Sequence, residues 1–528
     1  MQRTSHTRIA RSLLLGLLLT ACGSGPTIPD TVGNGPPPRP TLSPTYRASG
    51  HMQIGDVFVH LFEWKWTDIA RECEAVLGPA GFTAVQVSPP QEHSVQSSHT
   101  WSERYQPVSY SIARSRSGTG TEFGDMVSRC KVAGVGIYVD AVINHMTNSP
   151  SPGIGSNGTA YSKYEYPGLY TASDFHAPCA LDNYQSAANV QECELLGLPD
   201  LDTGSPTVRQ KIAAYLVMLA RLGVAGFRID AAKHIQQVEL DKIFGIVDST
   251  MAAEGRALPY YFLEVSGRNE AIVPADYYGE AYSSGNAADI TEFTFVGVGN
   301  KFLGTNGEHI SQLNPNGGPG NQFSAQAWGM MPSDKAVVFL QNHDTQHQGG
   351  ISYRDGQTFR LANVWMLAQP YGYPSILSSY AFDRPAQNDM GPPSDANGNT
   401  NDVVCASNLE TATVGQWVCE HRDPYVQRMV PFRHVVAGTD VNHWWDDGAN
   451  AIAFSRGDRG FVVINHEGSP LSATLSTGLA AGTYCDLLTG GLGNSGCVGS
   501  AVTVSASGSV QISLPANMAI AIDVMAKI

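Results

Sequence analysis

The sequence predicts an α/β protein built on a (β/α)8 TIM barrel, followed by a smaller all-β domain. Two patterns lead to this prediction. Short apolar segments alternate with segments of helical periodicity through most of the chain, which is typical of a parallel sheet covered by helices. From about residue 440 the alternation gives way to short strand-like segments separated by turns. The length of 528 residues suffices for both domains.

Eight segments fit the strands of the barrel. They are residues 57–61, 84–87, 136–142, 226–230, 261–265, 290–295, 336–340 and 375–377. Between them, residues 68–77 and 207–222 have helical spacing of apolar side chains. The second helix has a start signal in Ser205-Pro206 and a stop signal in Gly223.

The expected domain limits follow from changes in this pattern. We place the barrel at residues 49–146 and 206–439, with an irregular insert at 147–205 that is rich in Gly, Ser, Asn, Tyr and Pro. Long irregular inserts in compact domains are usually functional. Residues 440–528, with strand-like segments at 451–454, 460–464 and 509–513, are expected to form an antiparallel β-sandwich.

The N-terminal residues have the features of an export signal. Arginines at positions 3, 8 and 11 precede an apolar run at 13–19 that is too short to span a bilayer, so residues 1–21 are expected to be a signal peptide. Leu19-Thr-Ala-Cys22 resembles a bacterial lipobox, which would place a lipid on Cys22. The alternative is ordinary cleavage near Ala21 with Cys22 incidental. Residues 22–48 are expected to be a flexible linker. The protein would then be an exported lipoprotein of the cell envelope or an extracellular protein.

Composition restricts the possible partners. The net charge is −15, from 32 basic and 47 acidic residues, which argues against nucleic acid or an anionic membrane surface. Only 15% of the residues are charged, which suits an exported protein that binds a neutral polymer. We expect a monomer whose only membrane contact would be the lipid anchor.

The segment Gly223-Val-Ala-Gly-Phe-Arg-Ile-Asp-Ala-Ala-Lys-His234 carries the strongest chemical signal. Because side chains alternate along a strand, Arg228 and Asp230 face the same side, at the strand's C-terminal end. Catalytic groups of βα-barrels lie at that end. Taken alone, the pair is equally compatible with a buried structural ion pair.

This segment resembles the nucleophile strand of the α-amylase family of glycoside hydrolases. Three more family stretches follow the expected order: Asp140-Ala-Val-Ile-Asn-His145, Phe262-Leu-Glu-Val265 and Phe339-Leu-Gln-Asn-His-Asp344. The resemblance runs from about Val59 to near the C-terminus. It is closest to the animal, chloride-type members, as in VHLFEWKW, QVSPPQE, ERYQPVSY and VCEHR. It also implies that the insert is a separate small domain, domain B.

The resemblance implies a role for each of three carboxylates. Asp230 would be the nucleophile, Glu264 the general acid and then base, and Asp344 would bind sugar hydroxyls and help to distort the ring. Glycoside hydrolysis needs two carboxyl groups beside the scissile bond, one of them protonated. We expect Arg228, two residues away on the same face, to keep Asp230 ionised.

Further family positions imply contacts with the substrate. The residues expected to bind sugar are Trp101, Tyr105, Gln106, His145, Arg228, Lys233, His234 and His343. Two features depart from the animal members. Ser102 stands where a second tryptophan is usual, and Thr345-Gln-His-Gln-Gly-Gly350 is shorter than the family's glycine-rich mobile loop.

Nine cysteines are present, and setting Cys22 aside leaves an even number in a chain expected to be exported. The sequence alone does not give their connectivity. The resemblance implies the pairs Cys73–Cys130, Cys179–Cys193, Cys405–Cys419 and Cys485–Cys497. No CxxC pair occurs, so a zinc site is disfavoured.

Two ions are at issue. The resemblance implies a calcium ion held by Asn144, Gln191, Asp200 and His234, with Gln191 and His234 acting through backbone carbonyls, in keeping with the ion's preference for oxygen ligands. Alternatively, Asp200 simply caps a turn. In chloride-type relatives an arginine, an asparagine and a second basic residue hold the anion. These positions correspond to Arg228, Asn342 and Ser375, and because serine is uncharged we expect chloride not to be required.

The sequence therefore favours a retaining, endo-acting α-amylase that hydrolyses internal α-1,4-glucosidic bonds in starch, glycogen or maltodextrins. An α-glucan transglycosylase or an exo-acting maltooligosaccharide-forming relative could use the same carboxylates. A non-catalytic starch-binding surface protein is disfavoured because all three carboxylates are present.

Overall fold

A computed structural model describes residues 55–278 and 288–528 of the chain. The expected signal peptide, linker and Cys22 lie outside these residues. The predicted barrel is confirmed: eight parallel strands close in the order β1-β12-β11-β10-β9-β8-β5-β2. Their bounds are β1 Phe58–Leu61, β2 Ala84–Val87, β5 Gly136–Ala141, β8 Gly226–Ile229, β9 Tyr260–Leu263, β10 Asp289–Thr291, β11 Ala336–Val338 and β12 Tyr373–Ser378.

The interior of the barrel is filled by large side chains. Phe58, Tyr138, Tyr260, Phe262 and Tyr373 form a buried aromatic cluster with Ala84 and Val337. This cluster fills the interior of the barrel, and the candidate site lies where the strands end, at their C-terminal edge.

Strand β10 is shorter than the segment 290–295 expected from the sequence. The side chain of Glu292 accepts a hydrogen bond from the backbone N–H of Thr294, at 2.9 Å, and residues Phe293–Val296 turn into a 3-10 helix. The apolar run is therefore divided between a strand and a helical turn, which periodicity could not show.

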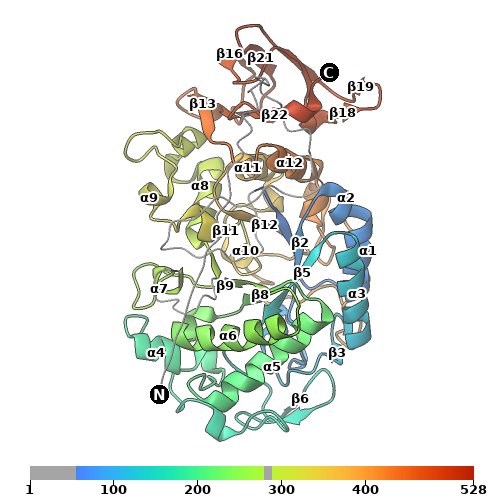
Figure 1. Cartoon of the computed structure of the whole chain (residues 1–528), viewed down its shortest axis with the longest axis vertical. Helices are drawn as coiled ribbons and strands as arrows, with labels where there is room; N and C mark the ends of the chain where they lie inside the picture. Colours follow the sequence, from blue (N-terminus) through green and yellow to red (C-terminus); the bar gives the residue numbers. More distant parts are fainter. Residues whose placement is uncertain (1–54, 279–287) are drawn as a thin grey trace, which may run out of the picture. The chain divides into compact units, whose positions relative to one another are not determined.

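Helices cover the barrel (Figure 1). Helix α5 starts with Pro206 at its first turn and ends before Gly223, whose φ of 106° continues the chain in the left-handed region. It packs alongside α6. The helices outside the insert are α1 Trp66–Glu72, α2 Gly78–Ala80, α3 Gly120–Val132, α5 Pro206–Leu222, α6 Gln237–Ala253, α7 Ala275–Tyr278, α8 Gly297–Leu303, α9 Ala325–Trp328, α10 Thr345–Gln348, α11 Gln357–Ala368 and α12 Pro424–Val435.

The irregular insert between β5 and α5 has little regular structure. It contains a small hairpin whose strands have two residues each, β6 Gly153–Ile154 and β7 Ala160–Tyr161, and the short helix α4 Ala187–Glu192. Its core is aromatic: Tyr161, Tyr166, Tyr170 and Phe175 are buried and pack against one another. Backbone hydrogen bonds from Met146 to Pro199 and from Leu201 to Asn144 hold both ends of the insert against the end of β5.

The C-terminal residues form two four-stranded antiparallel sheets with a common apolar core. One sheet has the order β13-β14-β15-β22 and the other β16-β21-β20-β17. Their bounds are β13 Val441–Asp446, β14 Ala451–Arg456, β15 Gly460–Asn465, β16 Leu471–Ser476, β17 Gly482–Cys485, β20 Ala501–Val504, β21 Ser509–Leu514 and β22 Met518–Asp523. Two smaller hairpins pair β3 Arg114–Ser115 with β4 Gly118–Thr119 and β18 Leu492–Gly493 with β19 Gly496–Cys497.

All four implied disulfides are formed: Cys73–Cys130, Cys179–Cys193, Cys405–Cys419 and Cys485–Cys497. Among the described residues, none of the helices has the length and apolar character needed to cross a membrane.

Candidate active site

Arg228 is at the centre of the candidate site. It lies on β8, and its Nη1 donates to Asp230 Oδ1 and to Asp140 Oδ1, both at 2.7 Å. Its Nη2 lies 2.9 Å from Glu264 Oε1. One buried guanidinium therefore joins carboxylates that follow or end three neighbouring strands, β5, β8 and β9.

The backbone brings these groups together. Asp140 and Arg228 are direct cross-strand partners in the parallel pairing of β5 and β8. Asp230 and Glu264 each follow immediately after a strand. Ala231 then takes a left-handed conformation, with φ of 49°, and its N–H donates to Glu264 Oε2 at 2.8 Å. A non-glycine residue in this conformation is strained, and such strain is common at functional sites.

The charges of the site do not balance. Arg228 is one cation beside Asp140, Asp230, Glu264 and Asp344, all on the same face of the barrel. Burial raises the pKa of Asp230 well above its usual range, although Arg228 opposes this shift. Burial and the neighbouring Glu264 raise the pKa of Asp344 to about 7. Arg228 favours the ionised form of Asp230, but it shares its guanidinium with Asp140 and Glu264.

Tyr105 and two histidines form an adjacent wall. The Tyr105 hydroxyl donates to Asp140 Oδ2 at 3.0 Å, and its ring stacks on that of His343, with centroids 5.1 Å apart. His145 Nε2 contacts the Tyr105 carbonyl oxygen at 3.0 Å. Burial lowers the pKa of His145 to about 4 and that of His343 well below its usual range, so both rings are neutral at neutral pH.

Trp101 lies beside this wall, with its ring 5.7 Å from that of Tyr105 and 5.9 Å from that of His343. Its indole N–H donates to the carbonyl oxygen of Asn388 at 3.0 Å. One face of the indole is stacked against His347, at 5.2 Å and an interplanar angle of 8°. That face is therefore not free for a sugar ring.

Lys233 and Gln106 contact other parts of the chain. Lys233 pairs with Glu270, and its ammonium lies 4.9 Å from the ring of Tyr184, which belongs to the insert. Gln106 Oε1 accepts a hydrogen bond from the hydroxyl of Thr147, at 3.1 Å. The expected sugar-binding residues thus border the junction between barrel and insert.

The expected calcium ligands lie in two groups at the junction between barrel and insert. Asn144 Nδ2 lies 3.1 Å from Asp200 Oδ1, and both residues are buried. His234 Nδ1 contacts the Val190 carbonyl oxygen at 2.8 Å, which places His234 against the helix α4 that carries Gln191. Burial raises the pKa of Asp200 to about 7, so a cation would stabilise its ionised form.

These residues fit calcium in donor type. The ion takes carboxylate, amide and carbonyl oxygens, and a flip of the Asn144 amide would turn its oxygen towards Asp200. Within residues 55–278 and 288–528, no cluster of three or more His, Cys, Asp or Glu residues is arranged to hold a metal. The fit therefore depends on the amide and backbone oxygens. His176 is an additional neighbour, with Nδ1 2.7 Å from Asp200 Oδ2.

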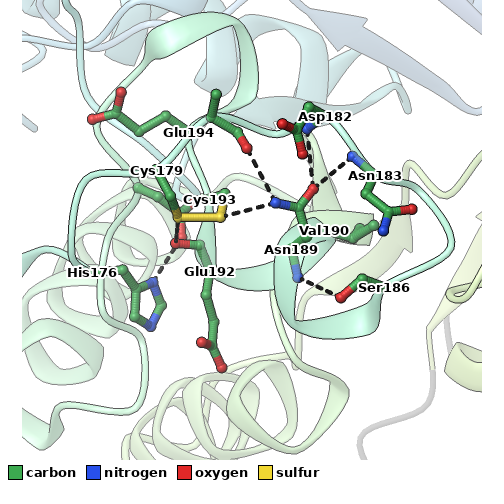
Figure 2. Close-up of a disulfide and its surroundings, with 12 residues drawn as sticks. His176, Cys179, Asp182, Asn183, Ser186, Asn189, Val190, Glu192, Cys193 and Glu194 are labelled. Carbon is green, nitrogen blue, oxygen red and sulfur yellow. Dashed lines mark hydrogen bonds and ion pairs between the residues drawn. A yellow bond between two sulfur atoms is a disulfide. The ribbon is translucent and has the colours of Figure 1, made fainter.

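The disulfide Cys179–Cys193 secures this region (Figure 2). Asn189 of α4 lies beside it: its side-chain amide donates to Cys193 Sγ at 3.2 Å, and its side-chain oxygen accepts from the N–H groups of Asp182 and Asn183. The disulfide and this network together fix the position of α4.

Ser375 lines a cavity of about 20 Å³ behind Arg228. His60, Gln86, Gln341 and Asn342 also line it. This volume is sufficient for a water molecule. Burial and then Arg228 lower the pKa of His60 to about 3, so Arg228 is the cationic side chain among these residues at neutral pH.

Comparison with known proteins assigns the family. Residues 77–376 match the family model described as "Alpha amylase, catalytic domain", and residues 443–525 match "Alpha amylase, C-terminal all-beta domain". The chain is 44% identical over 476 residues to an α-amylase of Tenebrio molitor, covering 88% of this chain and 95% of that protein. It is 43% identical over 490 residues to an α-amylase of Tribolium castaneum, covering 89% and 94%.

A solved structure supports the same family assignment. A glutamate-to-glutamine variant of α-amylase I from Eisenia fetida, in complex with maltohexaose, is 36% identical, with a TM-score of 0.81, and the match covers 91% of this chain and 99% of that one. The barrel, its cluster of carboxylates and these comparisons define the chain as a glycoside hydrolase. It belongs to the α-amylase family.

Several residues of the site were not anticipated from the sequence. Asp140 accepts a hydrogen bond from the same Arg228 nitrogen as Asp230. Its position on β5, opposite Arg228 of β8, is the feature that could have predicted this contact. His176, Tyr184 and Glu270 come from loops and His347 from the four-residue helix α10, which are too irregular or too short for a periodicity to show which way a side chain points.

Proposed function

We propose that this chain is a retaining, endo-acting α-amylase that hydrolyses internal α-1,4-glucosidic bonds of starch, glycogen and maltodextrins. The main support is the position of Arg228, which holds Asp230 and Glu264 through the two nitrogens of one guanidinium. This brings the two carboxyl groups close together. Retaining enzymes need a short separation, about 5 Å, because the nucleophile itself must reach the anomeric carbon.

In the proposed reaction Asp230 attacks the anomeric carbon while Glu264 donates its proton to the departing glycosidic oxygen. The bond from carbon to that oxygen breaks, and a covalent glycosyl-enzyme forms. Glu264 then takes a proton from water, which attacks the same carbon and releases Asp230. Two inversions leave the product in the α configuration.

The neighbouring side chains are proposed to bind and orient the reacting sugar. Asp344, His145 and His343 would contact its hydroxyls, and the ring of Tyr105 would support its apolar face. Neutral imidazoles suit this task, because they can form hydrogen bonds without adding a charge beside the carboxylates. His145 Nε2 already donates to the Tyr105 carbonyl oxygen, which fixes the orientation of its ring. Gln106, Lys233 and His234 would bind further units, with Lys233 and His234 on the leaving-group side.

Calcium is proposed to be held by Asn144, Asp200 and the backbone carbonyls of Gln191 and His234. When bound, it would join the barrel to the insert. Chloride is proposed not to be required. An anion behind Arg228 would have to leave water for a site without a second cationic side chain, since Ser375 occupies the position expected to be basic.

The alternative functions are separated by product analysis. An exo-acting enzyme releases one short product from the start, whereas an endo-acting enzyme abolishes iodine staining of starch while few reducing ends have formed. A transglycosylase forms products longer than its substrate. We also propose that the protein is exported, in keeping with its four disulfides.

The test of the mechanism is Glu264→Gln. This isosteric change removes the acidic proton, so we expect turnover of soluble starch to fall by at least about a thousandfold while maltoheptaose still binds. The wild-type protein should release α-anomers, observed by NMR before mutarotation. β-Anomers at early times would exclude Asp230 as a nucleophile.

A further inference from the structure

The imidazole of His347 lies between two aromatic rings. It is stacked on Trp101, with centroids 5.2 Å apart and an interplanar angle of 8°, and on Phe382, at 4.4 Å and 30°. Trp101 belongs to the loop after β2, His347 to the loop after β11, and Phe382 to the loop after β12. One stack therefore ties together three loops at the C-terminal face of the barrel.

The start of the β11 loop is fixed by its own hydrogen bonds. Asn342 Oδ1 accepts from the N–H groups of Asp344 and Thr345, and the Thr345 hydroxyl accepts from the N–H of Asn342. Helix α10 therefore begins directly after Asp344 and carries His347 towards Trp101. The position of the imidazole is a consequence of how this short loop folds.

His347 is held in this stack as a neutral ring. Burial, then Arg354 and Arg384, lower the pKa of His347 to about 4. Its Nδ1 is buried and has no hydrogen-bond partner among the described residues. Its Nε2 contacts the side-chain nitrogen of Gln346, at 3.4 Å. Because Nδ1 gives up a hydrogen bond here, the main contribution of the imidazole is the face of its ring, which a phenylalanine could also supply.

We propose that His347 is a specificity-determining residue, which covers the face of Trp101 that would otherwise stack on a glucose unit and so removes one sugar subsite. Trp101, beside the wall of Tyr105 and the two histidines, is one of the residues expected to bind sugar, and an indole face can stack on a pyranose ring. With the imidazole at 5.2 Å and nearly parallel, a sugar ring cannot occupy the same face. On the side of Trp101, the row of sugar subsites is therefore one unit shorter than it would be if this face of the indole were uncovered. This inference rests on the proposed function, because it concerns α-glucan chains.

The first measurement is direct binding, in a Glu264→Gln background that does not consume the ligand. Maltooligosaccharides of four to seven units are titrated by calorimetry against this parent, His347→Ala and His347→Phe. In the parent, affinity should rise with ligand length up to a certain number of glucose units. In His347→Ala it should go on rising for one unit more, and the longest ligand should bind about threefold to tenfold more tightly than it binds the parent. His347→Phe keeps the stack and should bind like the parent. Gln348→Ala, at the exposed neighbouring position, is the matched control.

The second measurement is the distribution of cleaved bonds in end-labelled maltoheptaose, in the otherwise unaltered enzyme. His347→Ala should move the preferred bond by one unit, and His347→Phe should not. Tryptophan fluorescence and the melting temperature show whether each variant is folded. If His347→Ala were unfolded, His347→Asn, which keeps a planar polar group but no ring, replaces it in both measurements.

The outcomes separate the two proposals. The role of His347 would be overturned if the imidazole changed neither the dependence of affinity on ligand length nor the distribution of cleaved bonds. The α-amylase proposal would then remain intact. A wild-type protein that neither binds nor hydrolyses maltooligosaccharides would overturn both.

Discussion

Removal of the positive charge of Arg228 should move the acid limb of the pH–activity profile upward. The argument follows from the three carboxylates that this side chain contacts. Arg228 lowers the pKa of Asp230, against the effect of burial. A unit charge about 4 Å away contributes about 4 kcal/mol at an effective dielectric constant of 20, which corresponds to about three pKa units.

The observable shift is smaller, because the same charge acts on Asp140 and Glu264 as well. We expect Arg228→Ala to raise the acid limb of kcat/KM by at least about one pH unit. The sign follows from the chemistry: the nucleophile must be ionised, and loss of a neighbouring cation favours its protonated form. Below the new pKa, activity falls about tenfold for each pH unit.

The assay is kcat/KM for a chromogenic maltooligosaccharide between pH 4 and 9, at constant ionic strength. Arg228→Lys is the matched control, since it keeps the charge but cannot present two nitrogens to two carboxylates. Arg228→Lys should lower turnover, but it should shift the acid limb of the pH–activity profile less than Arg228→Ala does. The reasoning would be refuted if folded Arg228→Ala, verified by circular dichroism, kept the acid limb of the wild type.

Three further outcomes are expected. A chelator should lower the melting temperature of the wild type, because an ion bound only by the folded state adds about 2.7 kcal/mol at a hundred times its Kd; Asp200→Asn should shift much less, and equal shifts would remove Asp200 from the site. Replacing Cys179 and Cys193 by serine should lower the free energy of unfolding by about 3 kcal/mol, because the disulfide closes a chain separation of 14 residues. The same replacement should also weaken the effect of the chelator. Replacing Cys485 and Cys497, which are 12 residues apart, should lower the stability without changing the effect of the chelator. Sodium chloride titrated at constant ionic strength should leave turnover largely unchanged; a saturable, several-fold activation at millimolar concentration would show that Ser375 does not abolish anion binding.

Much of the architecture was accessible from the sequence, because it follows from local patterns. The eight strands were predicted from apolar periodicity, and the helix 207–222 from the same periodicity with Pro206 and Gly223 at its ends; the observed helix is Pro206–Leu222. The disulfides were not: their pairing came from a family resemblance, since distance along the chain does not determine which sulfurs meet.

The carboxylates of the site were recognised in the sequence, but their electrostatics were not. A strand pattern places Arg228 and Asp230 on one face. It cannot show that Asp140, 88 residues earlier, receives a hydrogen bond from the same nitrogen. That contact comes from the pairing of β5 with β8, and it changes Arg228 from the partner of one carboxylate into the shared cation of several.

What the sequence determined by itself is the set of elements and the candidates for the reactive groups, because periodicity and motifs are properties of neighbouring residues. What only the tertiary structure decided is which surfaces remain available. The sequence predicts only that Trp101 binds sugar, and the folded chain covers one face of its indole with His347 of α10, a residue 246 positions away. Loops have no repeating pattern to fix the direction of a side chain, so their contacts depend on the closure of the whole barrel, which brings the ends of distant strands to one face.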